Sequence, residues 1–149
     1  EFAKVIQRLL QELKVHIVIT GTENERHFFE KLRALTQAPL MNAVGKTSVF
    51  QLQELITTCD LYITNDSGPI HIAAFLHSPL IAIFAGGHIR RFDPRIIDAN
   101  AVVFRQEIDC SPCNNKQCKV LRCVKSFSSE EIAKASIALL GTRDKIRNV

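Results

Sequence analysis

The sequence lacks tryptophan and contains one tyrosine and one methionine. No apolar run approaches the roughly 20 residues that a membrane-spanning helix needs, and no basic start leads into an apolar segment with a cleavage site. Repeats, linkers and low-complexity segments are also lacking. Basic residues are neither clustered nor interleaved with aromatic residues, as they are in proteins that bind single-stranded nucleic acid. These absences favour a cytoplasmic protein with no nucleic-acid partner.

What the chain does contain fits one globular domain or part of one. It has 149 residues, of which 46% are hydrophobic and 23% are charged. The formal charge of +4 comes from 19 basic and 15 acidic residues. This balance favours anionic partners only weakly, and a solvated basic surface without specific meaning explains it equally well. Because an amphipathic pattern has already begun at Phe2 and the first residue is not methionine, we expect a piece of a longer protein.

The spacing of apolar residues predicts alternating helices and strands. Helices are predicted over residues 2–14, 25–35, 49–56, 69–76 and 130–140, and strands over 15–20, 40–44, 61–64, 80–85 and 101–104. Residues 15–20 have the β-branched composition of a strand buried on both faces. Segments 86–98 and 105–127 are predicted to be irregular. The alternation predicts an α/β fold, with a Rossmann-like parallel sheet and helices on both faces.

The most informative segment runs from Asp60 to Ala74, where a strand passes through a polar turn into a helix. In open α/β sheets, ligands bind beyond the carboxyl ends of the strands, where a following helix presents unpaired amides. Gly68 allows a ligand to approach the backbone closely, and this suits a phosphate. The alternative is that Asp66 or Ser67 merely caps the helix.

His71 lies one helical turn beyond Ser67, so both side chains are expected to face the same space. A histidine at this place is suited to a phosphate, although a buried core histidine is the alternative.

Three segments resemble one family. NDSGPIHIAAFLHSPLIAIFAG resembles the signature of the lipopolysaccharide heptosyltransferases, inverting enzymes of glycosyltransferase family 9 with the two-domain GT-B architecture. ITGTENER and CSPCNNKQCKVLRCVKSFSSEEI resemble flanking segments of the same family. The resemblance implies that residues 1–149 are the carboxyl-terminal, nucleotide-sugar donor-binding domain, without its first strand and without the amino-terminal acceptor domain. It also implies transfer of heptose from ADP-heptose to the lipopolysaccharide core, with no cofactor.

The resemblance assigns the donor-binding residues one by one. Ser67, Gly68 and His71 would hold the diphosphate, and Asp66 would reach the donor sugar. Glu25 would contact the ribose, with Glu23 as a weaker candidate. A glutamate that simply starts a helix is the alternative for both. Thr47 would lie near the adenine, through its backbone.

The same resemblance shows departures and gaps. Family members have Phe-Gly-Pro-Thr-Asp where this chain has Ala85-Gly86-Gly87-His88 after Phe84. The catalytic base, a carboxylate, belongs to the amino-terminal domain, so no catalytic residue is expected in this chain and alone it should be inactive. The absent first strand should lie between strands 15–20 and 61–64. The acceptor would be bound by the absent domain, at the inner face of the bacterial inner membrane.

Two groups of residues have open assignments. Arg90, Arg91 and Arg95 would meet an anionic acceptor or a phosphorylated membrane surface, or would simply be solvated. Four cysteines, Cys110, Cys113, Cys118 and Cys123, would bind zinc, remain reduced, or form a disulfide on oxidation.

Two other functions remain open as well. The chain could be a non-catalytic nucleotide-binding module or degenerate relative, or a small metal-binding or nucleic-acid-binding domain built around the cysteines and arginines.

Overall fold

The computed structural model describes every residue except 87–88, 112, 114–117, 119, 121 and 148–149. At residues 90, 91 and 142–147 it describes the backbone alone.

Helices and strands alternate along the chain as predicted. They are α1 (Phe2–Glu12), β1 (Ile17–Ile19), η1 (Glu23–Glu25), α2 (Arg26–Thr36), β2 (Leu40–Asn42), α3 (Val49–Thr58), β3 (Tyr62–Asn65), α4 (Pro69–Phe75), β4 (Leu80–Phe84), α5 (Ile89–Phe92), η2 (Pro94–Ile96), β5 (Val102–Arg105), α6 (Arg122–Lys125) and α7 (Ser129–Arg147). The segments predicted to be irregular contain the short helices α5, η2 and α6. Elements of three or four residues are too short to show a hydrophobic period.

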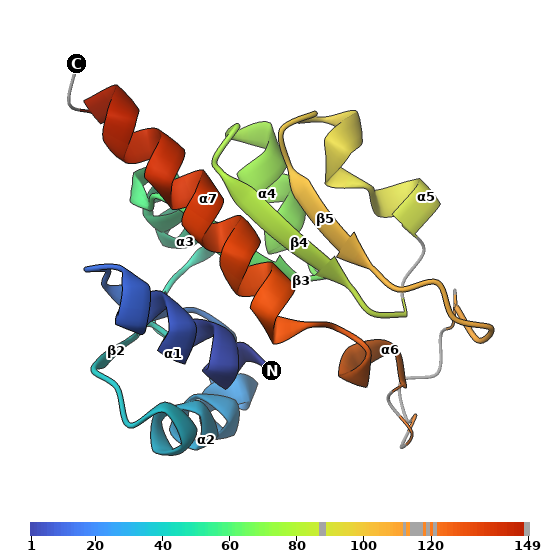
Figure 1. Ribbon diagram of the computed structural model, residues 1–149, viewed down its shortest axis with the longest axis horizontal. Coiled ribbons are helices and arrows are strands. Elements are labelled where there is room, and N and C mark those ends of the chain that lie inside the picture. The colour runs from blue at the N-terminus through green and yellow to red at the C-terminus, as the bar shows by residue number, and fades with distance from the viewer. Residues whose placement is uncertain (87–88, 112, 114–117, 119, 121, 148–149) are drawn as a thin grey trace.

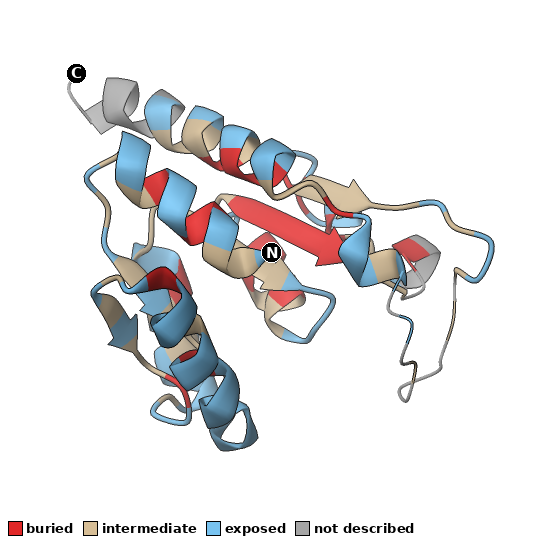
Figure 2. Cartoon of the chain, turned by 60° about the horizontal axis from the view of Figure 1, so that its bottom comes forward, coloured by how far each residue is buried: buried red, intermediate tan, exposed pale blue. Residues whose placement is uncertain are grey.

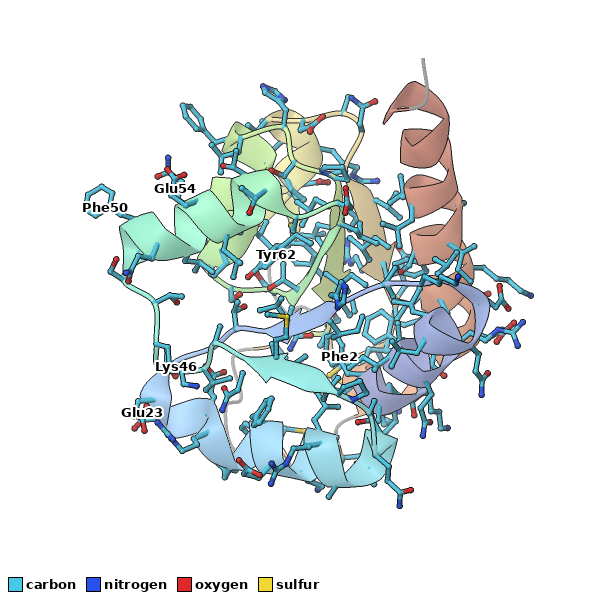
Figure 3. The ribbon with its side chains drawn as sticks, turned by 90° about the vertical axis from the view of Figure 1, so that its left-hand side faces the viewer. Phe2, Glu23, Lys46, Phe50, Glu54 and Tyr62 are labelled. Carbon is cyan, nitrogen blue, oxygen red and sulfur yellow. The ribbon has the colours of Figure 1, made fainter. Side chains whose placement is uncertain are left out.

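All paired strands run parallel, but they form two sheets instead of one. β1 pairs with β2, while β3, β4 and β5 form a separate three-stranded sheet. No ladder joins β1 to β3 in the described part of the chain. Side chains approach each other at this place instead: the Thr20 Oγ1 and Tyr62 hydroxyl atoms lie 3.5 Å apart. Tyr62 is labelled in Figure 3. The expected position of an absent central strand coincides with this break, and its presence in a longer protein stays a prediction.

The core is built around β4, whose five residues are all buried (Figure 2). Helices α3 and α4 cover one face of the three-stranded sheet, and α1 and α7 cover the other (Figure 1). Alternate residues of β4 therefore enter two separate hydrophobic clusters, with Ala82 and Phe84 on the α4 side and Ile81 and Ile83 on the α1 side. The prediction of helices on both faces is confirmed.

The prediction that strand 15–20 is buried on both faces is wrong. Val18 is 37% exposed, and its partner across the ladder, Met41, is 56% exposed. Val18 and Met41 are directly paired across the ladder. Because side chains alternate between faces along each strand, directly paired residues point to the same face of the β1–β2 pair. A two-stranded sheet with only one covered face leaves that side open.

The last helix begins where its sequence predicts. The Ser128 hydroxyl accepts a hydrogen bond from the Glu131 amide at 3.2 Å, and Glu130 and Glu131 occupy the first turn of α7. Acidic residues are favourable at this end of a helix. Nowhere in the described residues does a helix combine the length and the hydropathy required to cross a bilayer.

Candidate functional site

The turn from Asp66 to Gly68 connects the carboxyl end of β3 to α4. The Asp66 amide donates a hydrogen bond to the Ile83 carbonyl at 3.1 Å, which ties the turn to the end of β4. The Ser67 hydroxyl donates to the Asn65 carbonyl at 3.2 Å. The turn is thus fixed by its own strands, at the edge where open α/β sheets bind ligands.

The helix-cap account of Asp66 and Ser67 is wrong. Gly68 is the N-cap of α4, and no side chain caps this helix. The Ser67 hydroxyl points back to β3 instead. Nothing in the described part of the chain accepts a hydrogen bond from the Ser67 or Gly68 backbone amide. Two exposed amides at the end of a strand are therefore available to an external acceptor.

Gly68 leaves the backbone of the turn open. Its φ of −47° and ψ of −43° are right-handed helical values that any residue adopts, so backbone conformation does not require glycine here. A Cβ built at this position would meet nothing within 4 Å. Neither strain nor packing therefore requires the glycine, and its lack of a side chain leaves the backbone of the turn open to close approach.

Asp66 and His71 form the charged part of the turn. Partial burial raises the pKa of the Asp66 carboxyl above its usual range, and the charge of nearby His71 lowers it again in part. His71 is half-buried, and its ring centroid lies 5.9 Å from that of Phe92 in α5. The structure therefore brings together Asp66, Ser67, Gly68 and His71, as the sequence predicts.

A cavity of about 650 Å³ lies beside this turn. It opens at the ends of β3 and β4, and its walls come from α1, from the start of α7 and from the segment after β5. Its polar lining comprises Glu1, Asn65, Asp66, Arg122 and the four cysteines Cys110, Cys113, Cys118 and Cys123. The volume falls within the range of pockets that bind small molecules and cofactors.

Glu25 has a local structural role. Its Oε2 accepts hydrogen bonds from the Thr22 amide at 2.7 Å and the Thr22 hydroxyl at 2.8 Å, which completes a capping box before α2. The backbone hydrogen bond from Thr22 lowers the pKa of Glu25. The account of Glu25 as a helix-starting glutamate therefore holds in this structure.

Glu23 occupies a different position, between the loops that follow β1 and β2. Its carboxylate pairs with Arg26 at 2.7 Å, and the hydrogen bond from Arg26 lowers the pKa of Glu23. It also packs against Gly45, whose φ of +69° favours glycine and where a Cβ would overlap the carboxylate. Glu23 and Lys46 lie on the same side of the molecule in Figure 3.

Thr47 is half-buried, directly before Ser48, which caps α3 through a capping box with Gln51. No hydrogen bond or ion pair within the described chain joins Glu23, Glu25 or Thr47 to the Asp66–Gly68 turn. The structure therefore places the expected donor-binding residues in two groups, one at each sheet.

Of the three arginines between β4 and β5, the structure describes the side chain of Arg95. Arg95 pairs with Asp93 at 2.6 Å, which fits a local surface role. Gly87, His88 and the side chains of Arg90 and Arg91 lie outside the described residues.

Arg105 is a residue that the sequence reasoning missed. It ends β5 at the same edge of the sheet as the Asp66 turn, it is half-buried, and its buried Nε has no hydrogen-bond partner among the residues that the structure describes. The signal for it in the sequence is a basic residue at the end of an otherwise apolar strand.

The cysteines are not arranged as a metal-binding site in the part of the chain that the structure describes. None of the five cysteines, all of which the structure describes, is in a disulfide bond. No group of three or more histidine, cysteine, aspartate or glutamate residues, among those that the structure describes, is arranged to hold a metal ion. The structure therefore does not support the four-cysteine zinc site.

Comparison with known proteins identifies the family of the chain. The profile of glycosyltransferase family 9 (heptosyltransferase) matches residues 1–124, including the Asp66–Gly68 turn. The chain belongs to this family. Lipooligosaccharide heptosyltransferase 2 of Campylobacter jejuni is 30% identical over 143 residues, covering 93% of the chain and 44% of the relative. Lipopolysaccharide heptosyltransferase 2 of Escherichia coli is 33% identical over 86 residues, covering 56% of the chain and 25% of the relative.

Solved structures show the same fold. ADP-heptose lps heptosyltransferase II of E. coli superimposes with a TM-score of 0.78 at 24% identity, over 96% of this chain and 41% of that one. The family 9 glycosyl transferase of Veillonella parvula gives a TM-score of 0.72 at 24% identity, over 93% and 40%. The chain thus spans less than half the length of the relatives it matches. Its fold is the α/β architecture of family 9, as the sequence predicts.

Proposed function

We propose that this chain is the donor-binding domain of an inverting, GT-B-type heptosyltransferase and binds ADP-heptose at the Asp66–Gly68 turn. The observation that carries the proposal is the pair of Ser67 and Gly68 amides, which have no acceptor among the described residues and lie beside an open backbone. Membership of family 9 supports a nucleotide-sugar ligand.

The diphosphate is the part of the donor that this turn suits best. Backbone amides donate hydrogen bonds to phosphate oxygens, and such bonds to a charged acceptor are stronger than those between neutral groups. His71 adds a donor one helical turn away, and Asp66 accepts from sugar hydroxyls. In inverting transfer the nucleoside diphosphate departs with negative charge, so donors fixed in advance also stabilise the leaving group.

The adenosine end is assigned to the loops after β1 and β2. The resemblance favours Glu25 for the ribose, with Glu23 as the weaker candidate. The Glu25 carboxylate is engaged by Thr22, and both carboxylate oxygens of Glu23 are engaged by Arg26. Existing contacts therefore do not separate the two glutamates, and we keep the ribose at Glu25. Thr47, at the entry to α3, supplies backbone contacts to the adenine.

Transfer itself needs a base that deprotonates the acceptor hydroxyl. The proposal assigns this base, and the site for the lipopolysaccharide core, to polypeptide outside these 149 residues, working at the inner face of the bacterial inner membrane. The chain alone is then a binding domain without measurable transfer, and no metal ion or other cofactor takes part.

Calorimetric titration of the chain with ADP, ADP-heptose, UDP and a UDP-sugar tests the proposal. We expect the adenine ligands to bind at least tenfold more tightly than the uridine ligands, with ADP-heptose equal to or tighter than ADP. Equal binding of all four, or binding of none, contradicts it. A non-catalytic nucleotide-binding module would give the same titration but would show no transfer when joined to its complete parent polypeptide.

A further inference from the structure

The segment that follows β5 returns across the end of β4, close to the Asp66 turn. The Cys113 amide donates a hydrogen bond to the Gly86 carbonyl at 2.8 Å, which fixes this part of the cysteine segment against the residue just beyond β4. Cys123 approaches the same residue from the start of α6. Cysteines ten positions apart in the sequence are thereby brought to one glycine.

The two sulfur atoms lie near a single point. A Cβ built on Gly86 would lie 3.7 Å from the Cys113 Sγ and 3.9 Å from the Cys123 Sγ. Their separation is therefore bounded by the sum of those two distances, and no side chain at residue 86 stands between them. Both thiols are free and half-buried in the wall of the 650 Å³ cavity. Formation of a disulfide bond would need the two sulfur atoms to move from within this bound to about 2 Å from each other.

A metal ion does not account for this pair. Two thiols without a third ligand lack the four-coordinate set that structural zinc requires, and the described residues hold no group of three candidate ligands. Two neighbouring thiols are, however, sufficient for thiol–disulfide exchange.

We propose that Cys113 and Cys123 are a reversible dithiol–disulfide pair that reacts with low-molecular-weight disulfides such as oxidised glutathione. One thiol loses its proton to solvent, and the thiolate attacks the glutathione disulfide, releasing one glutathione thiolate and forming a mixed disulfide. The second cysteine, also as thiolate, attacks the protein sulfur of that mixed disulfide, forming the Cys113–Cys123 bond and releasing the second glutathione. The protein pair loses two electrons, and oxidised glutathione gains them.

The bond would tether α6 to the end of β4, beside Asp66. Asp66, Cys113 and Cys123 line the same cavity, so the disulfide changes the shape of the wall next to the proposed donor site. The pair itself does not depend on the proposed function, because thiol chemistry is measured without any nucleotide.

Thiol counting across glutathione redox buffers, with peptide mass mapping, tests the pair. The wild-type chain has five cysteines outside any disulfide bond and should lose two titratable thiols on oxidation, with one disulfide-linked peptide pair containing Cys113 and Cys123. C59S is the matched control, because Cys59 lies at the end of α3 with its Sγ on the Ile56 carbonyl, and it should also lose two thiols. C113S and C123S cannot form the intramolecular bond, so each should lose at most one thiol, as a mixed disulfide with glutathione that peptide mapping identifies, and should give no disulfide-linked peptide pair.

Three results would overturn the proposal. The first is a linked peptide that joins Cys110 to Cys118 while Cys113 and Cys123 stay free. The second is loss of two thiols in C113S as readily as in the wild type. The third is about one equivalent of zinc in the purified protein, with all four clustered thiols protected. Peptide mapping is done on the wild type, so it remains decisive even where a serine variant fails to fold.

Discussion

Replacement of Gly68 by alanine separates binding from stability at the proposed phosphate site. The backbone at residue 68 is already right-handed helical, and the new methyl group would meet nothing within 4 Å. A glycine-to-alanine change at such a position stabilises a protein by about 0.4–1 kcal/mol, mainly through the unfolded chain. For a domain of this size, this corresponds to a rise in Tm of about 1–4 °C.

The same methyl group should weaken donor binding. It would occupy the open space beside the two free amides, where a phosphate oxygen has to approach. A hydrogen bond to a charged group contributes about 1.5–3 kcal/mol, so loss of one or both contacts predicts roughly a 10- to 100-fold weaker Kd for ADP. Calorimetry measures the Kd and circular dichroism measures the Tm; the absence of tryptophan makes intrinsic fluorescence a poor substitute.

Gly141 provides the matched control. It lies within α7, and a Cβ at this position would also meet nothing within 4 Å. Gly141→Ala should stabilise the protein by about 1 kcal/mol, because glycine is unfavourable inside a helix, and should leave the Kd for ADP unchanged. If Gly68→Ala raises the Tm but binds ADP as tightly as Gly141→Ala does, the phosphate site is not at this turn. A fall in Tm for Gly68→Ala would contradict the open geometry itself.

Four further changes test other parts of the structure. Asp66→Asn should weaken ADP-heptose binding yet slightly stabilise the fold at neutral pH: burial raises the folded pKa of Asp66, so its carboxylate costs stability as pH rises through that value, and the gain should vanish in urea titrations below pH 3.8. His71→Ala should weaken the same binding with little change in Tm; a large drop in Tm with unaltered affinity would instead make His71 a core residue. Glu25→Ala should destabilise by about 1 kcal/mol at pH 7 through loss of the capping box, and because the folded pKa of Glu25 is lowered, this difference should shrink as pH falls below 4.5. Arg105→Met should raise the free energy of unfolding by about 1 kcal/mol, since it removes a buried Nε that has no partner in the described part of the chain; a loss of stability in urea denaturation would show that this nitrogen is satisfied in solution.

Local sequence patterns predicted the elements well because each strand and long helix has its own period. The run Leu80–Phe84 is continuously apolar, and it forms the one strand with every residue buried. The strand predicted at 15–20 is also mostly apolar, yet Val18 is exposed. Burial of that strand depends on what packs against it, and this cannot be read from the strand's own residues.

The candidate site was predictable where it is local in sequence. Asp66, Ser67, Gly68 and His71 fall in one turn and its helix, so the strand–turn–helix pattern places them together. The roles of Glu23 and Glu25 were not predictable, since both glutamates follow the same strand. Only the three-dimensional structure shows that one side chain turns back onto Thr22 while the other packs against Gly45.

The break between β1 and β3 also bears on which backbone amides are protected from solvent. Among the described residues no strand ladder crosses this break, and β2 therefore forms an outer edge of a two-stranded sheet, while β4 has a strand on each side. Amide protons of Met41 should then exchange with deuterium much faster than those of Ala82, which is fully buried.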